Sequence, residues 1–396
     1  MKIEHIEIHN YRVFKDAVVD DIPNYAVFIG KNGVGKTTFF DIFGFLHDCL
    51  INNVRYALDM RGGFDEVVSR DQKGHIGFTI KFRLEAREPL ITYELQIGLS
   101  ERGHPVVHLE RLRFRRGSRG APWLVLDFSN GKGRAVAGEI KSYEDAKKIE
   151  NRTEQELNSP DILAIKGLGQ FKEFIAVASL CKMIEDWHVF DFHIDETRQR
   201  KPNAAHTSLS TTGDNLVQVT KYLRDQYPDD FQNILNRMKE RIPSVSSVRA
   251  EETTDHHIVL QFQNEHFKNP FLSRFVSDGT MKMFTYLVLL NNPERHALLC
   301  IEEPENQLYP DLLSILAEEF RRYSQTGGQV FVSTHSPDFL NAIELDELYC
   351  IFVQNGYSVI RKISKSDLVK KLWKGGDPLG DLWIQKILME EAQKIT

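Results

Sequence analysis

The apolar positions of the chain begin with a strand pattern and then change to a helix pattern. Residues 2–9 alternate between apolar and polar side chains, and Tyr25–Ile29 is a continuous apolar run bounded by Pro23 and Gly30. Short apolar runs between turn residues are typical of buried strands. Over residues 38–50 apolar side chains recur every three or four positions, which predicts a helix with one apolar face. The opening unit is therefore strand, glycine-rich turn and helix.

A second region alternates in successive short runs, which predicts an antiparallel sheet. Its expected strands are 76–84, 91–99, 106–114 and 123–128. Helical spacing follows around 216–223 and 231–238, whereas 129–160 and 196–214 are polar and are expected to form loops.

The last third of the chain returns to alternating helices and strands. The expected order is helix 280–290, strand 298–301, helix 310–323, strand 330–333 and a hairpin over 349–360. This order predicts that both ends of the chain build one sheet and that the middle is inserted. The expected domains are an N-terminal lobe (1–128), a polar linker with a mainly helical insert (129–270), a C-terminal lobe (271–363) and a helical tail (364–396).

The composition of the chain mainly excludes classes of protein and kinds of site. The 396 residues include 50 Lys and Arg against 56 Asp and Glu, a formal net charge of -6, so a globally basic nucleic-acid binder is excluded but a local basic surface is not. The 4 cysteines lie far apart, which fits neither a zinc site nor a disulfide framework. With no signal-peptide pattern and no long apolar run, we expect a cytoplasmic protein that does not enter a membrane.

The glycine-rich turn carries the clearest chemistry. Residues 30–37 match G-x-x-x-x-G-K-[ST] in full, in the strand-to-helix context that this motif requires. Backbone N–H groups can surround phosphates there, while Lys36 reaches the β- and γ-phosphates and Thr37 supplies a ligand for Mg²⁺. The predicted cofactors are ATP and Mg²⁺, and the predicted binding residues are Gly30, Lys31, Asn32, Gly33, Val34, Gly35, Lys36, Thr37 and Thr38.

Two carboxylates end the apolar strand predicted at 298–301. Glu302 is expected to hold Mg²⁺ through water, and Glu303 to orient and deprotonate the attacking water. Asp is more usual at the position of Glu302, so the reach to the metal differs here. An acidic pair can also close a strand without any catalytic role.

The start of the helix predicted at 280–290 offers a third site. Ser277, Asp278 and Gly279 combine a hydroxyl and backbone N–H groups at a helix N-terminus, which can hold a γ-phosphate. Taken alone, this turn would be an ordinary helix cap.

Together, these motifs resemble those of ABC-class ATPases of the RecF, SMC and OLD-like branch. The resemblance covers nearly the whole chain and rests on "IEIHNYRVF", "GKNGVGKTT", "SDGTMKMFTYLVLL", "LLCIEEPENQLYP" and "STHSPDFL". It implies an α/β fold: an ABC-type P-loop ATPase head with an antiparallel strand-rich lobe and a helical insert. It further implies a homo-oligomer, at least a dimer, in which the Ser277 turn of one subunit closes on the phosphate loop of another.

The resemblance also implies individual roles. It places His335 as a switch histidine that contacts the γ-phosphate and the catalytic carboxylate, residues 305–308 in the D-loop, and Arg12 near the nucleotide. For the Q-loop glutamine, Gln170 is chosen over Gln72 because it follows the strand-rich lobe and precedes the helical insert.

The chain departs from these relatives in lacking a CxxC hook, a long coiled coil and an appended nuclease domain. We therefore expect an ATPase, converting ATP and water to ADP and phosphate, that regulates a separately encoded effector such as a nuclease. By analogy with similar ATPases the setting is bacterial antiviral defence or DNA maintenance, with DNA or RNA as an open partner. The alternatives are a RecF-like repair clamp, a transporter-type ATPase subunit and a non-hydrolysing ATP sensor.

Three further segments carry candidate binding features. Arg111, Arg113 and Arg115 share one face of a predicted strand, and Arg116 and Arg119 would extend it into a basic surface. The polar run 191–196 could hold a metal but is read as a loop edge. The tail 368–396 carries apolar residues at helical spacing and is read as a docking surface or as packing on its own lobe.

Overall fold

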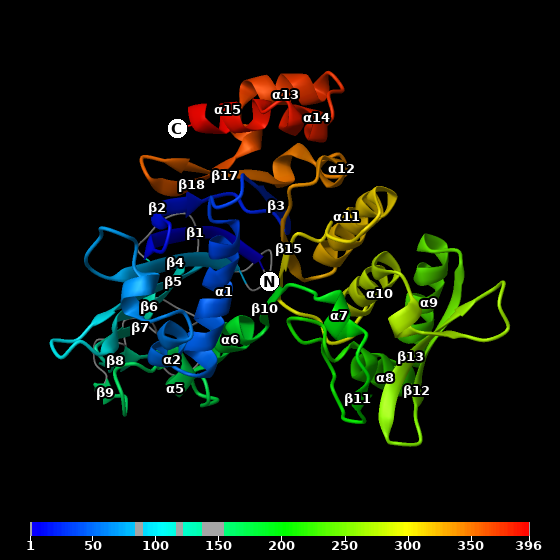
Figure 1. Ribbon diagram of the computed structural model, residues 1–396. Coiled ribbons are helices and arrows are strands. Elements are labelled where there is room, and N and C mark those ends of the chain that lie inside the picture. Colours follow the sequence, from blue (N-terminus) through cyan, green and yellow to red (C-terminus); the bar gives the residue numbers. More distant parts are fainter. Residues whose placement is uncertain (1, 84–89, 116–121, 137–153, 396) are drawn as a thin grey trace. The chain divides into compact units, whose positions relative to one another are not determined.

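The computed structural model describes residues 2–83, 90–115, 122–136 and 154–395 of the chain (Figure 1). The chain divides into two compact units. The first unit comprises residues 1–187, 344–377 and 385–396, and the second comprises 188–343 and 378–384. Both ends of the chain therefore belong to the first unit.

An eight-stranded antiparallel sheet occupies much of the first unit, in the order β2-β1-β4-β5-β6-β7-β8-β9. Ile3, Ile6 and Ile8 of the first strand are almost fully buried, so the alternation along this strand separates an apolar from a polar face. The four strands expected between residues 76 and 128 are confirmed. The strands are β1 (Lys2–Tyr11), β2 (Phe14–Val19), β4 (Ile76–Arg83), β5 (Leu90–Leu99), β6 (Pro105–Arg115), β7 (Trp123–Ser129), β8 (Lys132–Ala135) and β9 (Gln155–Glu156).

Three further strands of this unit carry the glycine-rich turn. β3 (Tyr25–Ile29) is buried along its whole length and pairs in parallel with β17 (Leu348–Gln354). In turn, β17 pairs antiparallel with β18 (Tyr357–Lys362). Because β3 and β17 come from opposite ends of the chain, the prediction that both ends share a sheet is confirmed.

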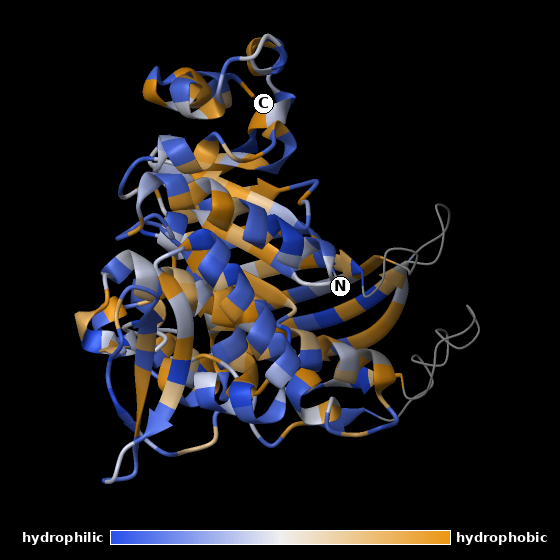
Figure 2. Cartoon of the chain, turned by 90° about the vertical axis from the view of Figure 1, so that its right-hand side faces the viewer, coloured by the Kyte–Doolittle hydropathy of each residue, from blue (hydrophilic) through white to orange (hydrophobic). Residues whose placement is uncertain are grey.

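Helix α1 (Lys36–Ile51) is covered by aromatic side chains on two sides. Phe39 contacts Phe28 of β3 with ring centroids 4.7 Å apart, and Phe45 contacts Tyr11 of β1 at 5.5 Å. Apolar positions concentrate along the strands and the helices that cover them (Figure 2). The helix following the glycine-rich turn is therefore fixed by packing on both sheets of its own unit.

The smaller helices of the first unit include α5 (Ala164–Leu168), which a buried carboxylate holds. Glu110 of β6 accepts hydrogen bonds from the backbone N–H groups of Ala164 and Ile165 and from the hydroxyl of Tyr93. Burial raises the pKa of Glu110 to about 7, against the lowering effect of these hydrogen bonds. The other helices are α2 (Val54–Asp59), α3 (Phe64–Val67), α6 (Ile175–Glu185), α13 (Asp367–Lys374) and α15 (Ile387–Lys394).

The second unit contains the parallel pair β15 (Leu298–Glu302) and β16 (Gln329–Ser333). Helix α10 (Asp278–Leu290) is buried along most of its length, and its Tyr286 contacts Phe320 of α11 (Pro310–Gln325), with ring centroids 5.5 Å apart. Each of these four elements was predicted, and each is confirmed.

The part of the second unit before α10 combines the expected helices with a hairpin that the sequence analysis did not predict. Strands β12 (Val245–Glu252) and β13 (His257–Asn264) pair antiparallel and bury alternate residues. The alternation of apolar and polar residues along these two strands is short and lies between two segments with helical spacing, so it was not recognised in the sequence. The domain boundaries expected at 128, 270 and 363 stay predictions. The remaining elements are β10 (Trp187–Phe190), α7 (Ile194–Thr197), β11 (Lys201–Pro202), α8 (Leu216–Gln226), α9 (Pro228–Arg241), β14 (Phe271–Leu272), α12 (Pro337–Leu340) and α14 (Leu379–Ile384).

Candidate nucleotide site

The phosphate loop of the first unit connects β3 to α1 and requires glycine at two positions for different reasons. Gly35 has φ 100°, and a Cβ there would lie 2.6 Å from the side chain of Val13. A Cβ on Gly30 would lie 2.4 Å from the carbonyl oxygen of Ile351. Both distances are shorter than real contacts allow, so the loop can follow this path only without side chains at these positions.

The start of α1 is arranged to receive an anion. Gly35 occupies the N-cap position and offers no side chain to the first N–H groups of the helix, which include those of Lys36, Thr37 and Thr38. The Lys36 ammonium donates to the carbonyl oxygen of Gly30 at 3.0 Å and is 7% exposed. The loop thus holds a cation beside a set of N–H donors, which is the chemistry of a phosphate site.

The loop is supported by a residue that the sequence analysis did not single out. Ser358 of β18 donates its hydroxyl to the carbonyl oxygen of Val34 at 2.7 Å and its backbone N–H to the carbonyl oxygen of Val13 at 2.8 Å. The second of these bonds joins β18 to the turn before β2 and fixes Val13 against the loop. Because Ser358 and Val34 are 324 positions apart in the chain, no local pattern could have predicted this support.

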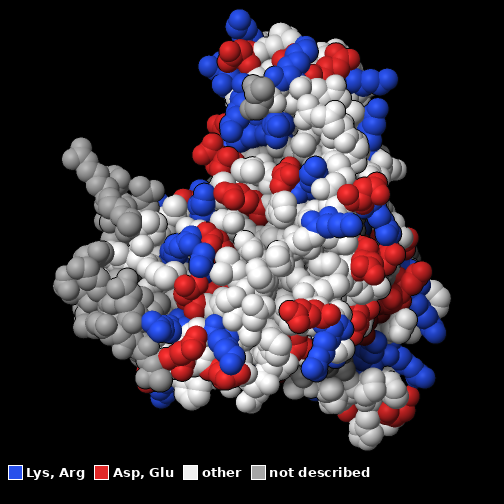
Figure 3. Space-filling view, turned by 90° about the vertical axis from the view of Figure 1, so that its left-hand side faces the viewer, with Lys and Arg blue, Asp and Glu red and all other residues white. Residues whose placement is uncertain are grey.

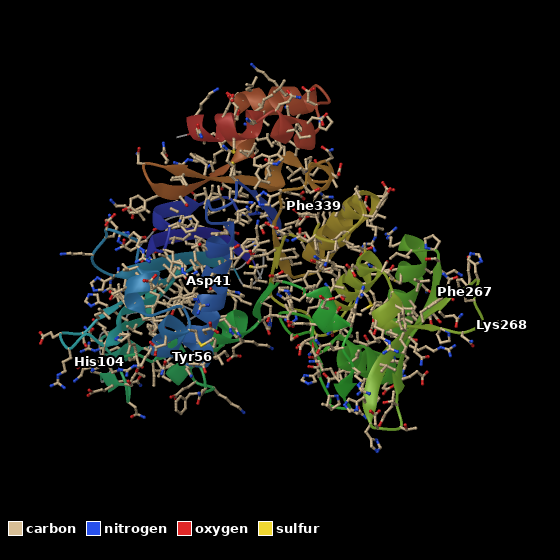
Figure 4. The ribbon with its side chains drawn as sticks, in the orientation of Figure 1. Asp41, Tyr56, His104, Phe267, Lys268 and Phe339 are labelled. Atoms are coloured by element: carbon tan, nitrogen blue, oxygen red, sulfur yellow. The ribbon has the colours of Figure 1, made fainter. Side chains whose placement is uncertain are left out.

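Arg12 lies near α1 and is held there by a carboxylate. Its guanidinium is 3.1 Å from Asp41, which also accepts hydrogen bonds from the Tyr11 hydroxyl at 2.7 Å and from Arg61 at 2.8 Å. Figure 4 labels Asp41 on α1. The role of Arg12 at the nucleotide stays a prediction, because in this structure its charge is engaged by Asp41.

The two candidate Q-loop glutamines differ in their surroundings. Gln170 is exposed in the turn after α5. Gln72 donates to the Tyr357 hydroxyl at 2.9 Å, and Tyr357 precedes the Ser358 that supports the phosphate loop. The choice of Gln170 stays a prediction, and this contact favours Gln72 as the alternative.

The carboxylates of the second unit lie where β15 ends. Glu302 is in register with Ser333 of β16, and the next residue, Glu303, turns the chain with φ 41°. The N–H of Glu303 donates to the Ser333 carbonyl oxygen at 3.0 Å. Its side chain lies 3.1 Å from Nε2 of His335 and accepts from the Asn306 amide at 3.2 Å. The two predicted catalytic residues of this unit are therefore in direct contact.

Glu305 positions His335 through hydrogen bonds to the turn that carries it. Its carboxylate accepts the Thr334 hydroxyl at 2.8 Å and the backbone N–H of His335 at 2.7 Å. The resemblance had placed Glu305 in the D-loop without a contact of its own. The structure shows that it fixes the turn on which the histidine is carried.

The turn at the start of α10 is held by an arginine that the sequence analysis missed. Ser277 caps the helix by accepting the N–H of Thr280 at 3.3 Å. Arg198 donates to the Val276 carbonyl oxygen at 2.7 Å and pairs with Asp278. The turn that is expected to contact a phosphate is thus clamped on the side of Asp278.

This turn also lies close to the D-loop of the same unit. A Cβ on Gly279 would be 3.3 Å from the carbonyl oxygen of Gln307. Behind it, Lys282 is 3% exposed, and burial lowers its pKa against the opposing effects of Asp191, Glu305 and Glu303. Burial therefore disfavours the charge of this lysine, and the negative charges of this unit favour it.

A known family model matches the parts of the chain that contain the phosphate loop and the carboxylates. The model of the family described as "AAA domain, putative AbiEii toxin, Type IV TA system" matches residues 26–164 and 187–341. The chain belongs to this family. None of the curated proteins shows significant sequence similarity to it.

Solved structures identify the fold of this AAA-family ATPase. An SMC head bound to the C-winged helix domain of ScpA is 12% identical, with a TM-score of 0.57, and the match covers 93% of this chain and 100% of that one. The SMC head with an extended coiled coil, bound to the C-terminal domain of ScpA derived from Pyrococcus furiosus, is also 12% identical, with a TM-score of 0.52 and coverages of 94% and 98%. The expected fold, the α/β fold of an ABC-type P-loop ATPase head, is confirmed.

Two arginines of the basic surface expected for this ATPase, Arg111 and Arg113, are neutralised by ion pairs. Arg111 pairs with Asp127, its partner in register on β7, at 2.6 Å. Arg113 pairs with Glu94 of β5, which lies diagonally across the strands because Thr92 is the residue in register with Arg113. Basic and acidic side chains are interspersed on the face shown in Figure 3. Residues 116–121, which include the two arginines expected to extend the surface, lie outside the described residues. Arg111 and Arg113 therefore form cross-strand ion pairs rather than a free basic patch.

The described part of the chain contains no group of three or more His, Cys, Asp or Glu side chains placed to hold a metal ion. No helix of that part is long and apolar enough to cross a membrane. Within the run 191–196, His193 lies 3.7 Å from Asp191. For Mg²⁺, the predicted ligands Thr37 and Glu302 offer a hydroxyl and a carboxylate oxygen, and these hard oxygen donors suit this ion.

Proposed function

We propose that this ATPase hydrolyses ATP in a Mg²⁺-dependent reaction for which Glu303 is the general base. The observation that carries the proposal is the 3.1 Å contact between Glu303 and His335, with Glu303 also held by Asn306. A carboxylate fixed from two sides can accept a proton from water in a defined direction. The complete phosphate loop and the membership of an ATPase family supply the substrate.

Each residue has a separate part in the proposed reaction. Lys36 and the N–H groups at the start of α1 bind and orient the phosphates. Thr37 and Glu302 would hold Mg²⁺, which when bound offsets charge on the phosphates. Glu303 takes a proton from water as the water oxygen bonds to the γ-phosphorus and the bond to ADP breaks. His335 donates to the Glu303 carboxylate and keeps it aligned.

Phosphate release by the purified chain tests this reaction. Release should require both ATP and Mg²⁺, and it should stop when EDTA removes the metal. Lys36→Ala should lose nucleotide binding together with turnover, because it removes the cation of the loop. Nucleotide binding without any phosphate release by the wild-type chain would instead establish the non-hydrolysing ATP sensor.

We further propose that ATP assembles two copies of the chain head to tail. The Ser277 turn of one copy would contact the phosphate loop of the other, so that two nucleotides lie in a two-fold symmetric dimer. Light scattering of the Glu303→Gln variant with and without ATP measures this assembly. If Ser277→Arg leaves both assembly and turnover unchanged, the turn has no role between subunits.

We finally propose that the dimer regulates a separately encoded effector, such as a nuclease, in antiviral defence or DNA maintenance. The solved SMC heads are bound to domains of another protein, ScpA, which supports a search for a protein partner here. The description of the matching family as a type IV TA system adds a toxin–antitoxin pair as a second setting. Co-expression with neighbouring genes, affinity purification and a nuclease assay with and without ATP distinguish these settings. Elution of the chain alone, with nuclease activity of its own, would contradict the two-component proposal.

A further inference from the structure

One segment of the second unit exposes aromatic side chains to solvent instead of burying them. Phe267, Phe271 and Phe275 are 55%, 38% and 67% exposed. They lie in the segment 265–275, which connects β13 to the turn before α10. Figure 4 shows Phe267 and Lys268 at the outer end of the connection between β13 and β14. Three exposed phenylalanines in one short segment mark a surface used for binding.

The segment holds a defined shape although it is exposed. Phe267 and Phe271 stack edge to face, with centroids 5.4 Å apart. The N–H of Phe267 donates to the Asn264 carbonyl oxygen at 3.2 Å, and Gln263 donates to the carbonyl oxygen of Phe267. Strand β14, which contains Phe271, is hydrogen-bonded to β13. The pairing of β14 with β13 and the hydrogen bonds of Phe267 therefore hold these two rings in a defined position.

Two cations alternate with these rings. Arg274 lies over the ring of Phe275, 4.7 Å from its centroid, and is exposed to solvent. Lys268 is exposed beside Phe267. Among the described residues neither Lys268 nor Arg274 forms an ion pair with a carboxylate, in contrast to Arg111 and Arg113 of the antiparallel sheet. The segment thus offers π faces together with two cations that form no ion pair among the described residues, while its one carboxylate, Glu265, lies beside His266.

We propose that the segment 265–275 binds single-stranded nucleic acid, with unpaired bases stacked on the phenylalanines and phosphates paired with Lys268 and Arg274. Rings interleaved with cations suit this ligand because every base has a π face and every nucleotide carries a negative charge. Base pairing in a duplex hides these faces, so the segment should discriminate against double strands. The proposal does not depend on ATP hydrolysis, and its test contains no ATP.

Fluorescence anisotropy of the full chain with labelled dT20, rU20 and a 20-base-pair duplex tests the proposal. Wild type should bind at least one of the two single strands more tightly than the duplex, and the two arms distinguish DNA from RNA. Phe267→Ala with Phe271→Ala should weaken binding at least tenfold, as expected for lost stacking. Lys268→Glu with Arg274→Glu should also weaken binding and reduce its salt dependence, because two phosphate contacts are lost.

A matched control comes from the first unit. Phe171 is 57% exposed and Lys172 next to it is exposed, so Phe171→Ala with Lys172→Glu makes the same kind of change elsewhere. This control should bind as wild type does, and circular dichroism should show all variants folded. The proposal is overturned if wild type binds neither single strand, if it prefers the duplex, or if the phenylalanine variant binds unchanged.

Discussion

The phosphate loop of the first unit and the carboxylate cluster of the second are built by different means. The loop is shaped by its own backbone: a Cβ at Gly30 or Gly35 would collide with neighbouring atoms. The cluster is shaped by side chains, since Glu303, Glu305 and Arg198 each depend on hydrogen bonds from other elements. We expect the phosphate loop to fail completely when a single added atom collides with its neighbours. The carboxylate cluster should lose function in steps, as its hydrogen bonds are removed one by one.

The largest effect is expected at Gly35. Gly35→Ala combines an unfavourable positive φ with a Cβ placed 2.6 Å from Val13, and we expect a loss of about 3 kcal/mol or more in the free energy of unfolding. Gly33→Ala is the matched control, because Gly33 also has a positive φ but a Cβ there would meet nothing within 4 Å. It should cost about 1 to 2 kcal/mol. Urea denaturation compares the two, and equal losses would remove packing as the reason for glycine at position 35.

Glu110 sharpens the comparison because its side chain joins β6 to α5 inside the first unit, so that this unit also contains a contact that depends on a side chain. Its folded pKa, about 7, lies above the ordinary value of 4.5. Its contribution to stability is therefore fully present below about pH 4.5 and is lost as the pH rises toward 7. Glu110→Gln does not titrate, so its free energy of unfolding should gain on wild type by up to about 3 kcal/mol over this range. Parallel stability curves for the two proteins would show that folding does not shift the pKa of Glu110.

Arg198 tests whether the turn before α10 needs its clamp. Arg198→Ala removes the donor to Val276 and the partner of Asp278, and we expect ATP-dependent dimerisation to weaken about tenfold or more. Arg200→Ala is the control, because Arg200 is an exposed arginine of the same segment that pairs with Asp255. Light scattering of both variants in the Glu303→Gln background measures the effect. Equal assembly of the two would mean that the turn holds its shape without Arg198.

The smallest effect is expected at Glu305. The Thr334 hydroxyl and the His335 N–H donate to the same oxygen of Glu305, so Glu305→Gln keeps this acceptor but removes the negative charge that strengthens both hydrogen bonds. We expect kcat to fall about tenfold with KM nearly unchanged, because only the alignment of His335 and Glu303 is disturbed. A rise in KM at constant kcat would instead place Glu305 in nucleotide binding.

The same contrast explains how much could be predicted from the sequence. The phosphate loop is eight consecutive residues, so its spacing alone identified it, and the buried strands and helices around it followed from their apolar periodicity. Arg198 clamps a residue 80 positions away, and such a partner is invisible without the fold. The ion pairs of Arg111 and Arg113 could not be predicted for the same reason, since Asp127 and Glu94 reach these arginines only after the strands pair.

Single-turnover hydrolysis by Glu303→Gln tests the central claim most directly. The variant should bind ATP as wild type does, because Lys36 and the loop are untouched. Its chemical step should be about 10² to 10⁴-fold slower, the usual loss when a general base is removed. Hydrolysis at the wild-type rate by a variant that binds ATP normally would contradict the assignment of Glu303 as the base.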